Sequence, residues 1–127
     1  MRAKILQNNK RVDGRKNDDI RQLKIDTKIF NRLHGSGLFQ RGETQALSIL
    51  TIAGPKSAQL IDDPDQAEYE KPYLHHYNFP PYSVGEARMM RGVSRREIGH
   101  GALAERALRY VVPTKDDGFP YTLRVVS

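Results

Sequence analysis

The chain has 127 residues, of which 38% are hydrophobic, so it has room for one domain at most and little space for a second core. It contains no cysteine, which excludes disulfides and thiolate metal sites, and its four histidines follow no zinc-binding spacing. No apolar run approaches the roughly 20 residues of a membrane span. The formal net charge of +6 favours polyanionic partners, although a charge of this size can also serve solubility alone.

Residues 1–19 are rich in Lys and Arg, contain few apolar side chains and include the turn-forming pair Asp13-Gly14. This composition predicts a basic lead-in or linker rather than a packed element. The folded domain is then expected over residues 20–127.

Alternating apolar and polar residues over 23–30 predict a strand with one solvated face. We expect residues 35–37, Gly-Ser-Gly, to interrupt the chain before a brief strand at Leu38-Phe39, and residues 41–43 to form a second turn. Apolar residues on both faces of 44–53 predict a central strand. These segments together predict an antiparallel meander.

The acidic segment around Pro64, residues 62–70, is predicted to be a solvated loop, and a metal site among its carboxylates is the less favoured alternative. Residues 73–79 predict a strand that ends at Pro80-Pro81. One of its faces carries four aromatic side chains, namely Tyr73, His75, Tyr77 and Phe79.

A helix is predicted to begin at Ser94, because Ser94-Arg95-Arg96-Glu97 has the spacing of a capping box, with Val93 and Ile98 as a hydrophobic staple. It is expected to run until Pro113. Its packing stripe is predicted to consist of Leu103, Ala104, Ala107, Leu108 and Val111. Residues 116–118 predict a turn, and residues 121–126 predict a strand that is still running near the last residue, so the domain is expected to be incomplete.

Two arginines in the first turn of this helix oppose the positive end of the helix dipole, which favours a bound anion. Arg95, Arg96 and the free N–H groups there are predicted to hold a phosphate or phosphodiester. His100 lies one turn after Arg96, so both are expected at the sheet-facing rim. The alternative is an ion pair of Arg96 with Glu43 or Glu86 and a hydrogen-bonded His100.

Glycines on both sides of His100, Gly99 and Gly101, each cost stability inside a helix and predict a close approach of a backbone or a ligand. Tyr77, Phe79 and Tyr82 are candidates for stacking on bases, although strand aromatics more often belong to a core.

Arg88 and Arg91, in the loop 85–92, are candidates for phosphate contacts or are simply solvated. No nucleophile–base pair or Walker-type glycine loop is present, so these residues alone do not define a reaction.

The segments HYNFPPYSVGE (residues 76–86) and RREIGHGALAERAL (95–108) closely resemble the second core domain of the bacterial polynucleotide phosphorylase family. The resemblance continues through residues 11–15, 34–47 and 119–127. It implies an α+β, ribonuclease-PH-like (ribosomal protein S5 domain 2-like) fold, truncated here to its N-terminal part, with a mixed or antiparallel sheet and a packed amphipathic helix. Residues 1–19 would connect it to a preceding helical region and a first core.

The resemblance also implies a phosphate-dependent 3′-to-5′ exoribonuclease that degrades single-stranded RNA and releases nucleoside diphosphates, with inorganic phosphate as co-substrate. Arg95 and Arg96 would contact phosphate or RNA as catalytic groups, with His100 beside them. A serine-rich phosphate-binding turn and acidic Mg²⁺ ligands would follow Ser127, so this segment holds no predicted metal ligand and is expected to be inactive alone. The alternative is a non-catalytic RNA-binding subunit of the same fold.

The family further implies a cytoplasmic homotrimer, RNA-binding modules after the second core and partners in an RNA-degradation complex. Glu86-Ala87-Arg88 departs from the Glu-Thr of the family at this position, which leaves the role of Arg88 open.

Overall fold

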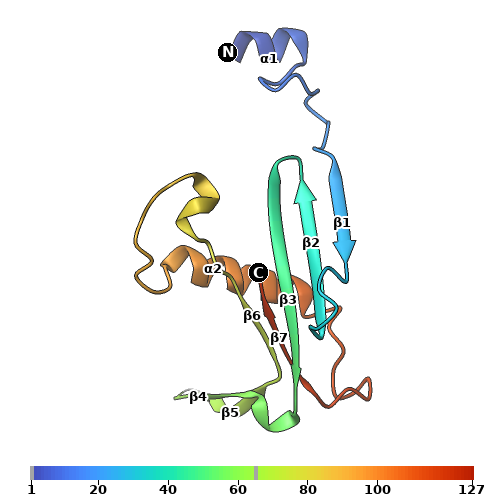
Figure 1. The fold of residues 1–127 in the computed structure, drawn as a ribbon, viewed down its shortest axis with the longest axis vertical. Coiled ribbons are helices and arrows are strands. Elements are labelled where there is room, and N and C mark those ends of the chain that lie inside the picture. Colours follow the sequence, from blue (N-terminus) through green and yellow to red (C-terminus); the bar gives the residue numbers. More distant parts are fainter. Residues whose placement is uncertain (1, 65) are drawn as a thin grey trace.

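The main sheet has five strands in the order β1-β2-β3-β7-β6 (Figure 1). The computed structural model describes residues 2–64 and 66–127. All neighbouring strands of this sheet are antiparallel except β6 and β7, which are parallel. The strands are β1 (Leu23–Thr27), β2 (Gly35–Arg41), β3 (Thr44–Ala53), β6 (Tyr73–His76) and β7 (Thr122–Val126). The other elements are α1 (Arg2–Asn8), η1 (Pro55–Ser57), β4 (Gln59–Asp63), β5 (Gln66–Lys71), η2 (Pro81–Val84) and α2 (Arg95–Leu108). The mixed sheet with one main helix confirms the α+β prediction.

The antiparallel meander is confirmed in β1, β2 and β3, and β3 is the central strand. Gly42 has a φ of 61° in the β2–β3 turn, a conformation that favours glycine. The predicted break at residues 35–37 is wrong, because Gly35 begins β2 and pairs with Leu50 of β3. A β-carbon at Gly35 would lie 3.1 Å from Leu50 Cδ2, so this glycine permits close packing within the strand pair.

The first strand is shorter than predicted. β1 ends at Thr27, because Lys28 adopts a φ of 57°, outside the extended region of the strand. The prediction of one buried face is also wrong, since Leu23 and Ile25 are both more than half exposed at this edge of the sheet.

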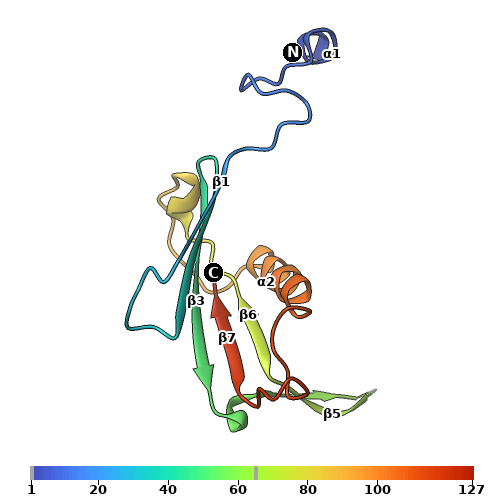
Figure 2. The ribbon, with the colours of Figure 1, turned by 90° about the vertical axis from the view of Figure 1, so that its right-hand side faces the viewer.

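The basic lead-in contains a helix that the sequence analysis did not predict. α1 is built from good helix formers and lies away from the sheet (Figures 1 and 2). Beyond it, the side chain of Arg15 binds the carboxylate of Asp13 at 2.8 Å and the carbonyl of Asp19 at 2.9 Å. Met1 lies outside the described residues.

The acidic segment forms a hairpin, which corrects the predicted loop. β4 and β5 pair antiparallel, with Ile61 opposite Tyr69, and in β5 the apolar residues Ala67 and Tyr69 alternate with the carboxylates. An exposed ion pair of 3.3 Å joins Glu70 to Lys115. Asp65 of the predicted loop lies outside the described residues.

A polar chain crosses three strands in the small core. Tyr73 OH lies 3.0 Å from His75 Nδ1, His75 Nε2 lies 3.1 Å from Ser127 Oγ, and that hydroxyl lies 2.7 Å from Ser48 Oγ. Burial lowers the pKa of His75, against the opposing charge of Glu105, and burial raises the pKa of Tyr73. Burial therefore favours the neutral imidazole of His75 in the folded state.

Candidate functional site

The start of α2 is held by the predicted capping box. Ser94 Oγ accepts from the backbone N–H of Glu97 at 3.2 Å, and the Glu97 carboxylate accepts from the backbone N–H of Ser94 at 2.7 Å. The staple partners Val93 and Ile98 are both largely exposed, so they bury little apolar surface. The cap is therefore polar, and it fixes the turn that carries Arg95 and Arg96.

Two carboxylates of α2 bind the free edge of β6 and of the segment that continues it. Glu97 Oε1 accepts from the backbone N–H of Phe79 at 2.8 Å, and Glu105 Oε2 accepts from the backbone N–H of His75 at 3.2 Å. Eight helical residues span about 12 Å and four extended residues about 13 Å, so the two spacings match. The helix thus occupies the place where a neighbouring strand would pair.

Gly101 lies midway between these two contacts, against the strand backbone. A β-carbon there would lie 3.1 Å from the carbonyl oxygen of His75 and 3.5 Å from the backbone nitrogen of Tyr77. The predicted close approach is confirmed at Gly101, where the neighbour is a backbone. At Gly99 a β-carbon would meet nothing within 4 Å, so no backbone approaches that glycine and the approach of a ligand there stays a prediction.

The packing face of α2 differs from the predicted apolar stripe. Glu97, Gly101 and Glu105 face the strand edge, whereas Leu103 is 64% exposed and Val111 is 77% exposed. The helix also ends at Leu108, five residues before Pro113. Hydrogen bonding to the edge of β6, rather than apolar burial, sets the orientation of this helix. The contact between α2 and the sheet is confirmed, but its apolar stripe is wrong.

Four site candidates from the helix and the strand form one cluster. The guanidinium carbon of Arg96 lies 4.4 Å from the centre of the Phe79 ring, a cation–π contact. The Phe79 and Tyr77 rings are nearly parallel, with centres 6.2 Å apart. Tyr77 in turn meets His100 edge to face at 5.1 Å. Helix residues one turn apart therefore contact Tyr77 and Phe79, which follow β6; the predicted strand over 73–79 ends at His76.

Arg96 lies against the ring of Phe79 rather than a carboxylate, so the alternative of an ion pair with Glu43 or Glu86 is not what the structure shows. The ion pairs found among residues 2–64 and 66–127 include neither Arg95 nor Arg96. Both side chains are exposed. Two cations at a helix N-terminus with this degree of access are available to an anion from solvent.

The loop between η2 and α2 borders an open groove of about 600 Å³ beside this cluster. Its lining includes Arg88, Arg91, Phe79 and Glu97. Tyr82, on η2, is 79% exposed and does not line the groove. The structure therefore brings Arg88 and Arg91 to the same hollow as the helix start and leaves Tyr82 on the open surface.

Glu97 has a second role that the sequence did not indicate, namely its bond to the backbone of Phe79. Its pKa is lowered to about 2, mainly because its carboxylate accepts the backbone N–H groups of Ser94 and Phe79, with a smaller contribution from the charge of Arg88. The capping-box spacing predicted the Ser94 contact. The Phe79 contact joins residues 18 apart, and no local pattern signals it.

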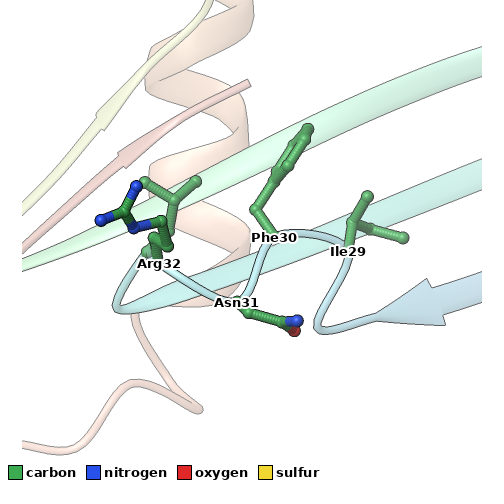
Figure 3. A pocket seen from close by; sticks show the side chains of 5 residues that line it. Ile29, Phe30, Asn31 and Arg32 are labelled. Atoms are coloured by element: carbon green, nitrogen blue, oxygen red, sulfur yellow. The ribbon is translucent and has the colours of Figure 1, made fainter.

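A second, apolar pocket of about 450 Å³ lies in the loop between β1 and β2, where Figure 3 shows Ile29, Phe30, Asn31 and Arg32 around it. Figure 2 shows this loop projecting from the side of the sheet opposite α2. None of the candidate site residues lines this pocket.

Comparison with known proteins identifies the family. The model of the family described as "3′ exoribonuclease family, domain 1" matches residues 19–127 of this chain. Polyribonucleotide nucleotidyltransferases from Picosynechococcus sp. and Synechococcus sp. are each 59% identical to this chain over its whole length, and that from Prochlorococcus marinus is 58% identical. The chain spans only 17–18% of the length of these relatives.

A solved structure, the Archaeoglobus fulgidus exosome with RNA bound to the active site, shares the fold. The superposition has a TM-score of 0.63 at 19% sequence identity. It covers 95% of this chain and 47% of the exosome chain. The ribonuclease-PH-like fold is thereby confirmed. The predicted family resemblance is confirmed as well, and this chain belongs to the 3′ exoribonuclease family.

Proposed function

We propose that this chain forms one wall of the active site of a polyribonucleotide nucleotidyltransferase that degrades single-stranded RNA from its 3′ end by phosphorolysis. The observation that carries this proposal is the first turn of α2. There, Arg95 and Arg96 are exposed at a helix N-terminus, and Arg96 is held over Phe79 instead of a carboxylate. Membership of the 3′ exoribonuclease family supports the reaction class.

In the proposed reaction, an oxygen of inorganic phosphate attacks the phosphorus of the last phosphodiester. A new P–O bond forms, the bond to the 3′ oxygen of the preceding nucleotide breaks, and that oxygen leaves with a proton. The products are a nucleoside diphosphate and an RNA shorter by one nucleotide. Because phosphate is the nucleophile, the protein needs positioning and positive charge rather than a nucleophilic side chain.

Residues of this chain would supply that positioning and positive charge. Arg95, Arg96 and the free N–H groups of the first helical turn would neutralise charge on the phosphates. His100, beside Tyr77, borders the same cluster, and Arg88 and Arg91 would contact the RNA backbone in the groove. Tyr82 offers an exposed ring for a base outside the groove. The related exosome structure has RNA bound to its active site, which supports RNA as the substrate class.

The described part of the chain, residues 2–64 and 66–127, contains no group of three or more His, Asp or Glu side chains that could hold a metal ion. No Mg²⁺ site is therefore proposed on this chain. The use of Mg²⁺ by the whole protein stays a prediction that concerns residues outside this chain.

The larger assembly also stays a prediction. A homotrimer, a cytoplasmic location and partners in an RNA-degradation complex follow from the family resemblance alone. In the described segments, no helix has the length and apolar character needed to cross a membrane.

The test uses the full-length protein with single-stranded RNA, inorganic phosphate and Mg²⁺. Release of nucleoside diphosphates is expected, and Arg95→Asp combined with Arg96→Asp should abolish it. Arg106→Asp combined with Arg109→Asp, near the other end of α2, is the charge-matched control and should remain active. Release of nucleoside monophosphates would contradict phosphorolysis, whereas RNA binding without any degradation would support the non-catalytic alternative.

A further inference from the structure

The carboxylate of Glu97 joins the two segments that carry the proposed site. One oxygen accepts from the N–H of Ser94 at 2.7 Å, and the other accepts from the N–H of Phe79 at 2.8 Å. We infer that Glu97 is a positioning residue for phosphorolysis, because it fixes the position of Arg96 relative to Phe79. This inference rests on the proposed function.

The position of Arg96 depends on this link in two ways. Its backbone belongs to the turn that Glu97 caps, and its guanidinium lies over the Phe79 ring, whose backbone N–H Glu97 also binds. Glu97 therefore links the first turn of α2 directly to the segment that carries Phe79. Phosphoryl transfer is sensitive to such alignment, since a misplacement of about 1 Å can cost about a hundredfold in rate.

Glu97 is suited to this role because it stays ionised at neutral pH. Its low pKa, about 2, follows from the two backbone N–H groups it accepts. A negative charge in the first turn also interacts favourably with the helix dipole and offsets the positive charges of the adjacent Arg95 and Arg96. Glu97 itself turns both oxygens to the backbone, so it is no candidate for direct contact with phosphate.

Glu105 makes the same type of contact at a place without site residues. It accepts from the N–H of His75 at 3.2 Å and pairs with Lys71 at 2.6 Å, two helical turns after Glu97. Both glutamates bind the edge of β6 and its continuation, but only Glu97 lies at the turn of Arg95 and Arg96. Glu105→Gln is therefore the matched control for a purely structural role.

The experiment compares Glu97→Gln, Glu97→Asp and Glu105→Gln in the full-length protein. Steady-state release of nucleoside diphosphate is measured with single-stranded RNA at varied phosphate. Glutamine presents an amide N–H₂ to one of two backbone donors, and aspartate keeps the charge but is one methylene shorter. Both changes at Glu97 are expected to lower kcat at least about tenfold, with the KM for RNA within about twofold. Glu105→Gln should keep kcat within about twofold.

Thermal melting of each variant separates loss of fold from loss of positioning. Equal kcat for Glu97→Gln and Glu105→Gln at matched melting temperatures would overturn the inference. If Glu97→Gln fails to fold, Glu97→Asp decides, and an unchanged kcat there would equally overturn it. An unmodified protein that releases no nucleoside diphosphate would overturn the proposed function instead.

Discussion

The backbone N–H of Phe79 donates to the carboxylate of Glu97 at 2.8 Å, which ties the segment that continues β6 to the first turn of α2. With the second bond, from His75 to Glu105, the helix satisfies an edge that would otherwise present unpaired N–H groups. Eight helical residues and four extended residues span nearly the same length, so both glutamates of α2 can reach their backbone N–H donors. The placement of Arg96 beside Phe79 follows from it.

The link between Glu97 and Phe79 should weaken in acid. The pKa of Glu97 is depressed to about 2 from an ordinary 4.5, so its stabilising contribution is complete above about pH 4.5 and is lost as the pH falls through about 2. We expect Glu97→Gln to reduce hydrogen-exchange protection of the Phe79 and Ser94 amides at pH 6 and to have little effect near pH 2. A constant difference between the two proteins over this range would contradict the assignment.

The two glycines beside His100 should respond in opposite directions to alanine. Gly99→Ala places its β-carbon in open space, so the opening free energy of α2 should rise by about 0.5–1 kcal/mol through helix propensity. Gly101→Ala places its β-carbon 3.1 Å from the His75 carbonyl oxygen and should lower that free energy by about 1–3 kcal/mol. Hydrogen exchange of the α2 amides measures both, and a stabilised Gly101→Ala variant would contradict the close approach.

The elements with local signals were predictable from the sequence, and those that depend on distant partners were not. The capping box located the start of α2, and an apolar segment with residues on both faces, after a glycine turn, located β3. The packing face of α2 was predicted wrongly, because hydrophobic periodicity does not reveal that Glu97 and Glu105 bind a strand edge. The acidic hairpin was missed because its many carboxylates suggested a solvated loop, although Ala67 and Tyr69 alternate with them in β5.

The same limit applies to the candidate site. Arg95, Arg96 and His100 were recognised as a group from helical spacing, since they share one short stretch of chain. Their partner Phe79 was predicted only as a separate stacking candidate, and its contact with Arg96 requires the fold. Arg96 contacts the ring of Phe79, whereas charge pairing alone had suggested a contact with the carboxylate of Glu43 or Glu86.

His75 should make the sheet sensitive to mild acid. Burial lowers its pKa below the ordinary 6.5, with Glu105 opposing and His76 adding to the shift. The unfolded chain therefore binds more protons than the folded chain once the pH drops below about 6.5, and stability falls from there until the folded pKa is passed. Protection of the β6 and β7 amides should fall between pH 7 and 5. That fall should diminish in His75→Gln but persist in His76→Gln, the exposed neighbour. An identical pH profile for His75→Gln would contradict this account.

The arginines of the groove should contribute to the salt dependence of RNA binding. Each phosphate contact on a single strand contributes about 0.7 to the slope of log affinity against log salt concentration. Arg88→Gln combined with Arg91→Gln in the full-length protein should therefore reduce that slope by about 1.4, if each side chain binds one phosphate. Fluorescence anisotropy of labelled single-stranded RNA at several salt concentrations measures it. An unchanged slope would show that these arginines are merely solvated.

Phe79 should be needed for its ring rather than for its bulk. The cation–π contact holds Arg96 at 4.4 Å from the ring centre, and an exposed contact of this type contributes about 0.5–1 kcal/mol. Loss of that contact corresponds to a reduction in kcat/KM of about two- to fivefold. Phe79→Leu in the full-length protein should show this reduction, because leucine keeps the backbone N–H for Glu97 but offers no π face.

Phe79→Tyr is the matched control, since it keeps the ring and should retain kcat/KM within about twofold. The effect of Phe79→Leu should also disappear once Arg96→Gln is introduced, because the ring then has no cation to hold. If Phe79→Leu reduces kcat/KM equally with and without Arg96, the ring acts through packing alone. In that case the placement of Arg96 rests on the Glu97 cap and not on the aromatic strand.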